Sequence, residues 1–117
     1  KTLFKLYELD RMGELKKKLG FTEGKRVVLY GAGDVAAFLL DKMIEYGMKP
    51  EFVIDSRWAK ENWRGVTVIH KDDCSLEKKI SDIDMVINTI SFYDDEVGRI
   101  LKNLNHPKKA LQLSDIL

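Results

Sequence analysis

The chain has 117 residues, with 20 Lys and Arg against 19 Asp and Glu, so its net charge at pH 7 is +1. This length fits one domain of the usual size, roughly 100–150 residues, with a core of its own. The hydrophobic share of 44% and the charged share of 33% are typical of globular proteins and exclude a disordered chain. A nearly neutral chain lacks the basic field that attracts nucleic acids, so we expect no nucleic-acid partner.

Cysteine content and hydropathy restrict the location of the protein. Cys74 is the single cysteine, which excludes an internal disulfide and a cysteine-based zinc site. The longest apolar run, Val35–Leu40, is far shorter than the roughly 20 residues of a membrane-spanning helix. Lys1–Leu19 carries charges throughout, unlike a signal peptide. We therefore expect a cytoplasmic protein without a membrane span, and the start at Lys1 indicates a piece of a longer protein.

Helical and strand patterns alternate along the chain. The apolar spacing predicts an N-terminal helix over Leu3–Leu19, closed by Gly20 after a basic turn. Helical spacing returns in three later segments, Asp34–Tyr46, Asp72–Ile80 and Asp94–Leu104. Short β-branched and apolar runs predict five strands, Arg26–Tyr30, Phe52–Ile54, Val66–Ile69, Met85–Ile90 and Ala110–Leu113.

This alternation predicts right-handed βαβ units and hence an α/β fold. We expect a Rossmann-like, open, doubly wound parallel sheet of five strands in the order 3-2-1-4-5, with an extra N-terminal helix. The N-terminal helix and its connection would form residues 1–24. The Rossmann-like nucleotide-binding domain would form residues 25–117.

A glycine-rich turn follows the first predicted strand and matches the pattern G-x-G-x-x-G/A over Gly31–Ala36. In such a turn Gly31 permits the tight bend, and Gly33 lets a phosphate approach the backbone. The free N–H groups and the dipole at the start of the next helix favour an anion, although the charge of Asp34 opposes one. The predicted binding loop comprises Gly31, Ala32, Gly33, Asp34 and Val35.

An acidic residue ends the second predicted strand. Asp55 follows Gly33 by about 20 residues, the position from which a carboxylate binds a ribose diol. Ser56 completes this side of the predicted site, whereas Arg57 would accommodate a 2′-phosphate. The ligand is therefore left open between NAD(P) and a nucleotide sugar. The alternative is a glycine turn that serves only the packing of strand and helix.

Ligands of open α/β sheets bind beyond the carboxyl ends of the strands, where the strand order reverses. The loop Asn88–Tyr93 faces the glycine turn there, and its Ser91 and Tyr93 are candidate ligand contacts. The alternative for Ser91 is a cap on the following helix. Trp58 and Trp63 either stack on a base or cover the sheet edge or another domain.

The chain offers no catalytic constellation. His70 and His106 lack a second ligand at metal spacing, and Cys74 lacks an activating partner. The Tyr-x-x-x-Lys pair of short-chain dehydrogenases is absent from the sequence. We therefore predict no catalytic residue and no metal site, and an NAD-dependent oxidoreductase fragment is an alternative that lacks a proton donor.

Three segments, Val27–Gly33, Phe52–Asp55 and Arg64–Ile69, resemble the small Rossmann-like domain that precedes the catalytic repeats of bacterial sugar O-acyltransferases. The accessory domains of polysaccharide-biosynthesis transferases and a redox-sensing NAD(H)-binding repressor are similar. The resemblance spans about residues 26–113, and it implies nucleotide-sugar binding by Gly31, Gly33 and Asp55. The chain departs from the pattern at Thr67, where Pro is usual, and near Asp34 and Val35, where a third Gly or a His is usual.

The resemblance implies a nucleotide-binding accessory domain of a bacterial enzyme of sugar or polysaccharide biosynthesis, most simply a transferase. A covalently attached partner domain would then supply the reaction, because the acyl-transferring β-helix is absent from the sequence. The alternative is a non-binding interaction module that positions a partner domain through the Leu3–Leu19 helix and the tryptophan connection. The nearly neutral charge is compatible with a homo-oligomer.

Overall fold

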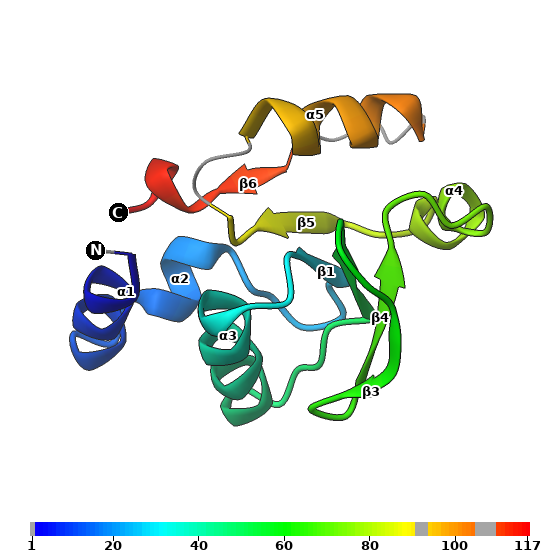
Figure 1. Cartoon of the computed structure of the whole chain (residues 1–117). Coiled ribbons are helices and arrows are strands. Elements are labelled where there is room, and N and C mark those ends of the chain that lie inside the picture. Colours follow the sequence, from blue (N-terminus) through cyan, green and yellow to red (C-terminus); the bar gives the residue numbers. More distant parts are fainter. Residues whose placement is uncertain (1, 91–93, 105–109) are drawn as a thin grey trace.

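A six-stranded open sheet organises the fold (Figure 1). The computed structural model describes residues 2–90, 94–104 and 110–117. The strands lie in the order β3-β4-β2-β1-β5-β6. Their bounds are β1 (Val27–Tyr30), β2 (Phe52–Asp55), β3 (Lys60–Trp63), β4 (Val66–His70), β5 (Met85–Asn88) and β6 (Leu111–Gln112). The helices are α1 (Thr2–Arg11), α2 (Leu15–Leu19), α3 (Asp34–Glu45), α4 (Leu76–Ile80), α5 (Asp94–Asn103) and a final 3-10 turn, η1 (Leu113–Asp115).

The predicted α/β class is confirmed, but the prediction of five parallel strands is wrong at one edge. The five expected strands keep their relative order, and β3 adds a sixth that pairs antiparallel with β4. Arg64 and Gly65 make the two-residue turn, with positive φ angles of 55° and 85°. Asn62 stabilises the turn, because its Oδ1 accepts the Gly65 N–H at 2.7 Å. The connection after β2 is therefore a hairpin instead of a plain loop.

The prediction of one helix over Leu3–Leu19 is also wrong, because the chain bends between α1 and α2. Gly13 takes a φ of +74° there, a left-handed conformation that ends the first helix. Gly20 closes α2 as expected, with a φ of 72°. Further along, α4 begins at Leu76 rather than at Asp72, because the Asp73 carboxylate accepts the Ser75 N–H at 2.8 Å in a turn that competes with the helix.

Helices cover both faces of the sheet, as a doubly wound fold requires. Val27 and Leu29 of β1 belong to the core cluster that includes residues of α1, α2 and α3. Val28 and Tyr30 belong to the cluster on the opposite face, which includes residues of α4 and α5. Because β1 is buried on both sides, its sequence is continuously apolar instead of alternating. Within the described residues, no helix has both the length and the apolar character needed to cross a membrane.

The N-terminal helices are part of this core. Leu6, Leu15 and Leu19 are almost completely buried in the cluster shared with β1 and α3. An ion pair of 2.8 Å between Lys42 Nζ and Asp10 Oδ2 also links α3 to α1, and this hydrogen bond raises the pKa of Lys42 above its ordinary value. Residues 2–24 therefore pack against the remainder of the chain through an apolar interface.

We predict that Leu6→Ala lowers the free energy of unfolding by about 2–5 kcal/mol, because it leaves a cavity in the core. The matched control is Phe4→Ala on the same helix, whose side chain is 66% exposed and whose loss should cost less than about 0.5 kcal/mol. Urea denaturation measures both. Equal effects from the two substitutions would contradict the assignment of α1 to the core.

Candidate functional site

The glycine turn lies at the carboxyl end of β1, between this strand and α3. Gly31 has a φ of +98°, and a Cβ placed on it would lie 2.6 Å from Ile90 Cγ1 and 2.8 Å from Thr89 Oγ1. A side chain is therefore excluded at Gly31 by both backbone conformation and packing. The next residue, Ala32, is buried, and its N–H donates to Asp55 Oδ2 at 2.9 Å.

Gly33 differs from Gly31 both in its backbone conformation and in the space around it. Its φ of −125° is open to any residue, and a Cβ on it would have no atom of the described residues within 4 Å. Gly33 caps the N-terminus of α3, and both Gly33 and Asp34 are exposed while Val35 is half-buried. The first N–H groups of an α-helix have no partner within the helix. The start of α3 therefore presents backbone donors next to open space.

Asp55 ends β2 with its side chain turned toward the glycine turn. It is completely buried, and its Oδ1 accepts the Arg57 N–H at 2.8 Å. The Arg57 guanidinium makes two longer contacts, Nε to Oδ1 at 3.3 Å and Nη2 to Oδ2 at 3.4 Å. Burial opposes the charge on Asp55, but the hydrogen bonds from Ala32 and Arg57 outweigh it and hold the pKa of Asp55 below its ordinary value.

The sequence predicted that Asp55 would face a ribose, and in the structure its oxygens already accept hydrogen bonds from the protein. The two contacts from the Arg57 side chain are the longest of these, and that side chain is 67% exposed. A ligand could therefore replace Arg57 at the carboxylate without breaking the bond to Ala32. Ser56 is half-buried beside this cluster.

The loop after β5 is attached to the glycine turn. Thr89 Oγ1 donates to the Tyr30 carbonyl at 2.8 Å, and the Thr89 N–H donates to the same oxygen at 3.0 Å. Asn88 Nδ2 donates to Gln112 Oε1 at 2.8 Å, which joins β5 to β6. These side chains serve the packing of the strand ends. Two predicted ligand contacts, Ser91 and Tyr93, lie outside the described residues.

The two tryptophans cover one side of the sheet. Trp58 and Trp63 are half-buried and pack on the core cluster that includes residues of α3. Cations lie over their outer faces, with Lys60 Nζ 5.9 Å from the Trp58 ring and the Arg64 guanidinium 5.7 Å from the Trp63 ring. This arrangement supports the packing alternative for both residues.

Cys74 and His70 lie near each other in the turn before α4, and His106 lies outside the described residues. Cys74 is exposed, and His70 Nδ1 accepts the Asp72 N–H at 3.1 Å. Across residues 2–90, 94–104 and 110–117, no group of three or more His, Cys, Asp or Glu side chains is placed to hold a metal ion.

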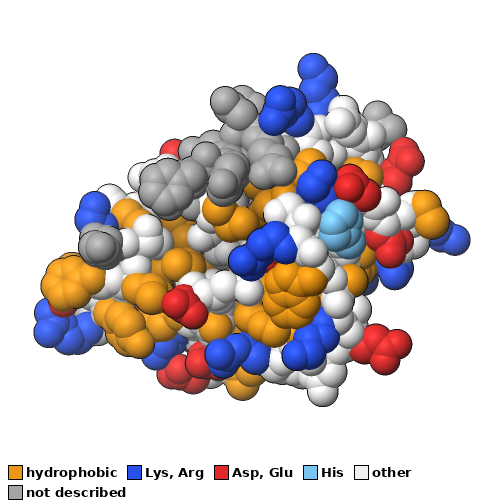
Figure 2. Space-filling model, in the orientation of Figure 1, with side chains coloured by type: hydrophobic (Ala, Val, Ile, Leu, Met, Phe, Trp, Pro, Cys, Tyr) orange, Lys and Arg blue, Asp and Glu red, His pale blue; other side chains and the backbone are white. Residues whose placement is uncertain are grey.

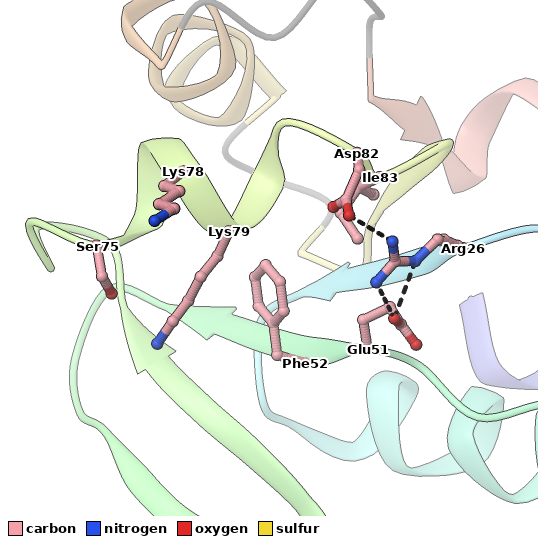
Figure 3. Close-up of a pocket in the computed structure, with 8 residues that line it drawn as sticks. All are labelled: Arg26, Glu51, Phe52, Ser75, Lys78, Lys79, Asp82 and Ile83. Carbon is pink, nitrogen blue, oxygen red and sulfur yellow. Dashed lines mark hydrogen bonds and ion pairs between the residues drawn. The ribbon is translucent and has the colours of Figure 1, made fainter.

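The sequence did not predict a polar cluster at the amino ends of the strands, opposite the glycine turn. Arg26 donates to Glu51 Oε1 from Nε at 3.0 Å and from Nη2 at 2.6 Å, and its Nη1 pairs with Asp82. This cluster lines a cavity at the amino ends of the strands (Figure 3). Its members lie 25 and 56 residues apart along the chain, so no local motif indicates it.

No family model matches the chain, and no curated protein does. The resemblance of Val27–Gly33, Phe52–Asp55 and Arg64–Ile69 to a sugar O-acyltransferase domain therefore stays a prediction.

We predict that Asp55→Asn lowers the free energy of unfolding at pH 7 by about 1–3 kcal/mol, because buried donors lose a charged acceptor. The lowered folded-state pKa of Asp55 has a further consequence for pH dependence. Its stabilising contribution is complete above the unfolded-state pKa of about 4 and is lost as the pH falls through the folded-state value.

Urea denaturation between pH 7 and pH 2 measures this effect. The wild type should lose more stability on acidification than Asp55→Asn, whereas a control variant at the exposed Glu23, Glu23→Gln, in the turn before β1, should follow the wild type. Parallel pH profiles for the wild type and Asp55→Asn would contradict the role assigned to this carboxylate.

Proposed function

We propose that this chain binds a nucleotide-type small molecule, NAD(P) or a nucleotide sugar, at the glycine turn and the start of α3. The observation that carries the proposal is the contrast between the two glycines. Gly31 is required by the fold, whereas neither backbone conformation nor packing requires a glycine at Gly33. A ligand phosphate that approaches the backbone at Gly33 explains why a side chain is missing there.

The phosphate would accept hydrogen bonds from the N–H groups of Gly33, Asp34 and Val35. The positive end of the α3 dipole adds to this attraction, while the exposed Asp34 carboxylate opposes it. Arg57 offsets that repulsion, because its exposed guanidinium lies near the same end of the sheet as the turn. In this arrangement Ala32 has a structural task, since its N–H binds Asp55.

The ribose would lie at the end of β2, next to Asp55 and Ser56. A diol can reach the Asp55 carboxylate once the Arg57 side chain moves away, and the bonds from the Ala32 and Arg57 backbones keep the carboxylate in place. A 2′-phosphate would pair with Arg57 instead. The proposal therefore includes both NAD and NADP as test ligands.

The wider role follows from the resemblance described above. We assign the chain to a cytoplasmic accessory domain of a bacterial enzyme of sugar or polysaccharide biosynthesis, in which an attached partner domain performs the transfer. The open, doubly wound α/β sheet supports this proposal, because β1 and β2 are parallel neighbours. The glycine turn after β1 and Asp55 of β2 therefore lie at the same end of the sheet.

A second candidate is an interaction module that positions a partner domain. It is favoured by four large apolar side chains that are more than half exposed, Phe4 (66%), Met12 (64%), Tyr7 (58%) and Ile44 (56%). Three of them lie on α1 or directly after it, and hydrophobic side chains gather at that end of the molecule in Figure 2. Exposed apolar patches of this kind mark protein contacts.

The two glycines provide the test of nucleotide binding. Wild-type protein should show a higher melting temperature with at least one of NAD, NADP, a UDP-sugar or S-adenosylmethionine at millimolar concentration. Gly33→Ala should fold with a loss of less than about 1 kcal/mol and bind that ligand at least tenfold more weakly. Gly31→Ala should instead destabilise the fold by more than about 1 kcal/mol, since it adds a clash to a strained φ.

Two results would count against this function. No shift with any of the four ligands would favour the interaction module, and so would equal ligand affinity in Gly33→Ala and the wild type.

A further inference from the structure

A cavity of about 570 Å³ lies at the amino ends of the strands, on the side of α4. Its wall includes Arg26, Glu51 and Ile83, which precede β1, β2 and β5 respectively. The glycine turn lies at the carboxyl ends of the same parallel strands. The cavity and the glycine turn are therefore at opposite ends of these strands. The volume is within the range of about 300–1,000 Å³ that small-molecule sites occupy.

One wall of the cavity is an ion-pair triad. The Arg26 guanidinium lies between Glu51 and Asp82, as the dashed lines of Figure 3 show. The hydrogen bond to Glu51 and the two negative charges raise the pKa of Arg26 above its ordinary value. Because two carboxylates surround one cation, this wall carries a net negative charge and repels an anion.

The opposite wall comes from α4 and is basic. It consists of Ser75, Lys78 and Lys79, and in Figure 3 the Lys79 side chain extends past the Phe52 ring. Within the described part of the chain, neither lysine ammonium forms an ion pair with a carboxylate. The lining carries three cations and two carboxylates, and two of the cations lie on α4, where the Asp73 carboxylate outside the lining also attracts Lys79.

The floor between these walls is apolar. Phe52 and Ile83 form it, and each is anchored in the core cluster that includes residues of α4 and α5, with 6% and 5% of its surface exposed. In Figure 3 the Phe52 ring stands between Lys79 and the Arg26 triad. Because both side chains are held by the core, the small parts that they expose form a rigid apolar floor, against which the edge of a ring can pack without ordering the protein further.

We propose that this cavity binds a small molecule that combines a flat apolar ring with one anionic group. The ring packs on Phe52 and Ile83, and the anion binds the ammonium groups of Lys78 and Lys79. The orientation is determined by charge, because Glu51 and Asp82 repel the anion from the other wall. The site is separate from the proposed nucleotide site and does not depend on it.

The test uses 2-naphthoate as the anionic probe and 2-naphthamide as its neutral isostere, with ¹⁵N–¹H NMR titration of the whole chain. Naphthoate should shift the amide signals of α4, Phe52 and Ile83, and it should bind at least fivefold more tightly than the amide. In the double variant Lys78→Gln/Lys79→Gln this preference should disappear. Both lysines are exposed, so the variant keeps its fold.

The chain offers a matched control in α2, another five-residue helix with lysines in its last turn. Lys17→Gln/Lys18→Gln removes the same charge from exposed positions outside the cavity, and it should leave naphthoate binding unchanged.

Equal loss of naphthoate affinity in both double variants would overturn the proposal, as would shifts confined to other regions of the chain or equal binding of the two probes. The nucleotide function is judged separately by Gly33→Ala, which should leave naphthoate binding intact.

Discussion

The structure at the carboxyl end of the sheet depends on the hydrogen bonds that the buried Asp55 carboxylate accepts. An unpaired charge in this position would cost several kcal/mol, so the fold requires the donors that surround it. The Ala32 N–H and the Arg57 N–H supply them, and they thereby join the end of β2 to the turn between β1 and α3. Gly31 then fits against Thr89, and α3 starts with its first N–H groups toward open space at Gly33. The shape of the turn is therefore maintained by the protein's own contacts.

The parts of the fold that the sequence predicted correctly are those with a strong local signal. The apolar run of β1 and the helical spacing of α3 identify both elements, and the glycine pattern between them locates the turn. Strand β3 lacks such a signal, because three of its four residues are exposed and polar. Its turn over Arg64 and Gly65 also lacks the Asn-Gly or Asp-Gly pair that marks most two-residue hairpins.

Other features depend on tertiary contacts that local patterns do not contain. The position of Asp55 in the sequence indicates a ligand contact, but its hydrogen bond to Ala32 appears only when β2 lies beside β1. The triad of Arg26, Glu51 and Asp82 likewise forms because β1, β2 and β5 are parallel neighbours, so their amino ends lie side by side. The change from helical to strand pattern indicates a boundary near residue 24, but it carries no information on the packing of Leu6 and Leu15 in the core cluster that includes β1 and α3.

The two outermost strands, β3 and β6, determine how readily copies of this chain could associate by strand pairing. Unpaired strand edges are templates for sheet extension and aggregation, and proteins protect them with charges or with very short strands. Here β3 carries Lys60 and Glu61 at one border, and β6, at the other, has only two residues. Both borders are thus poor sites for adding a strand from a neighbouring molecule. An assembly that includes this chain would form more readily through other surfaces, such as the exposed apolar side chains of α1, than through a continuous intermolecular sheet.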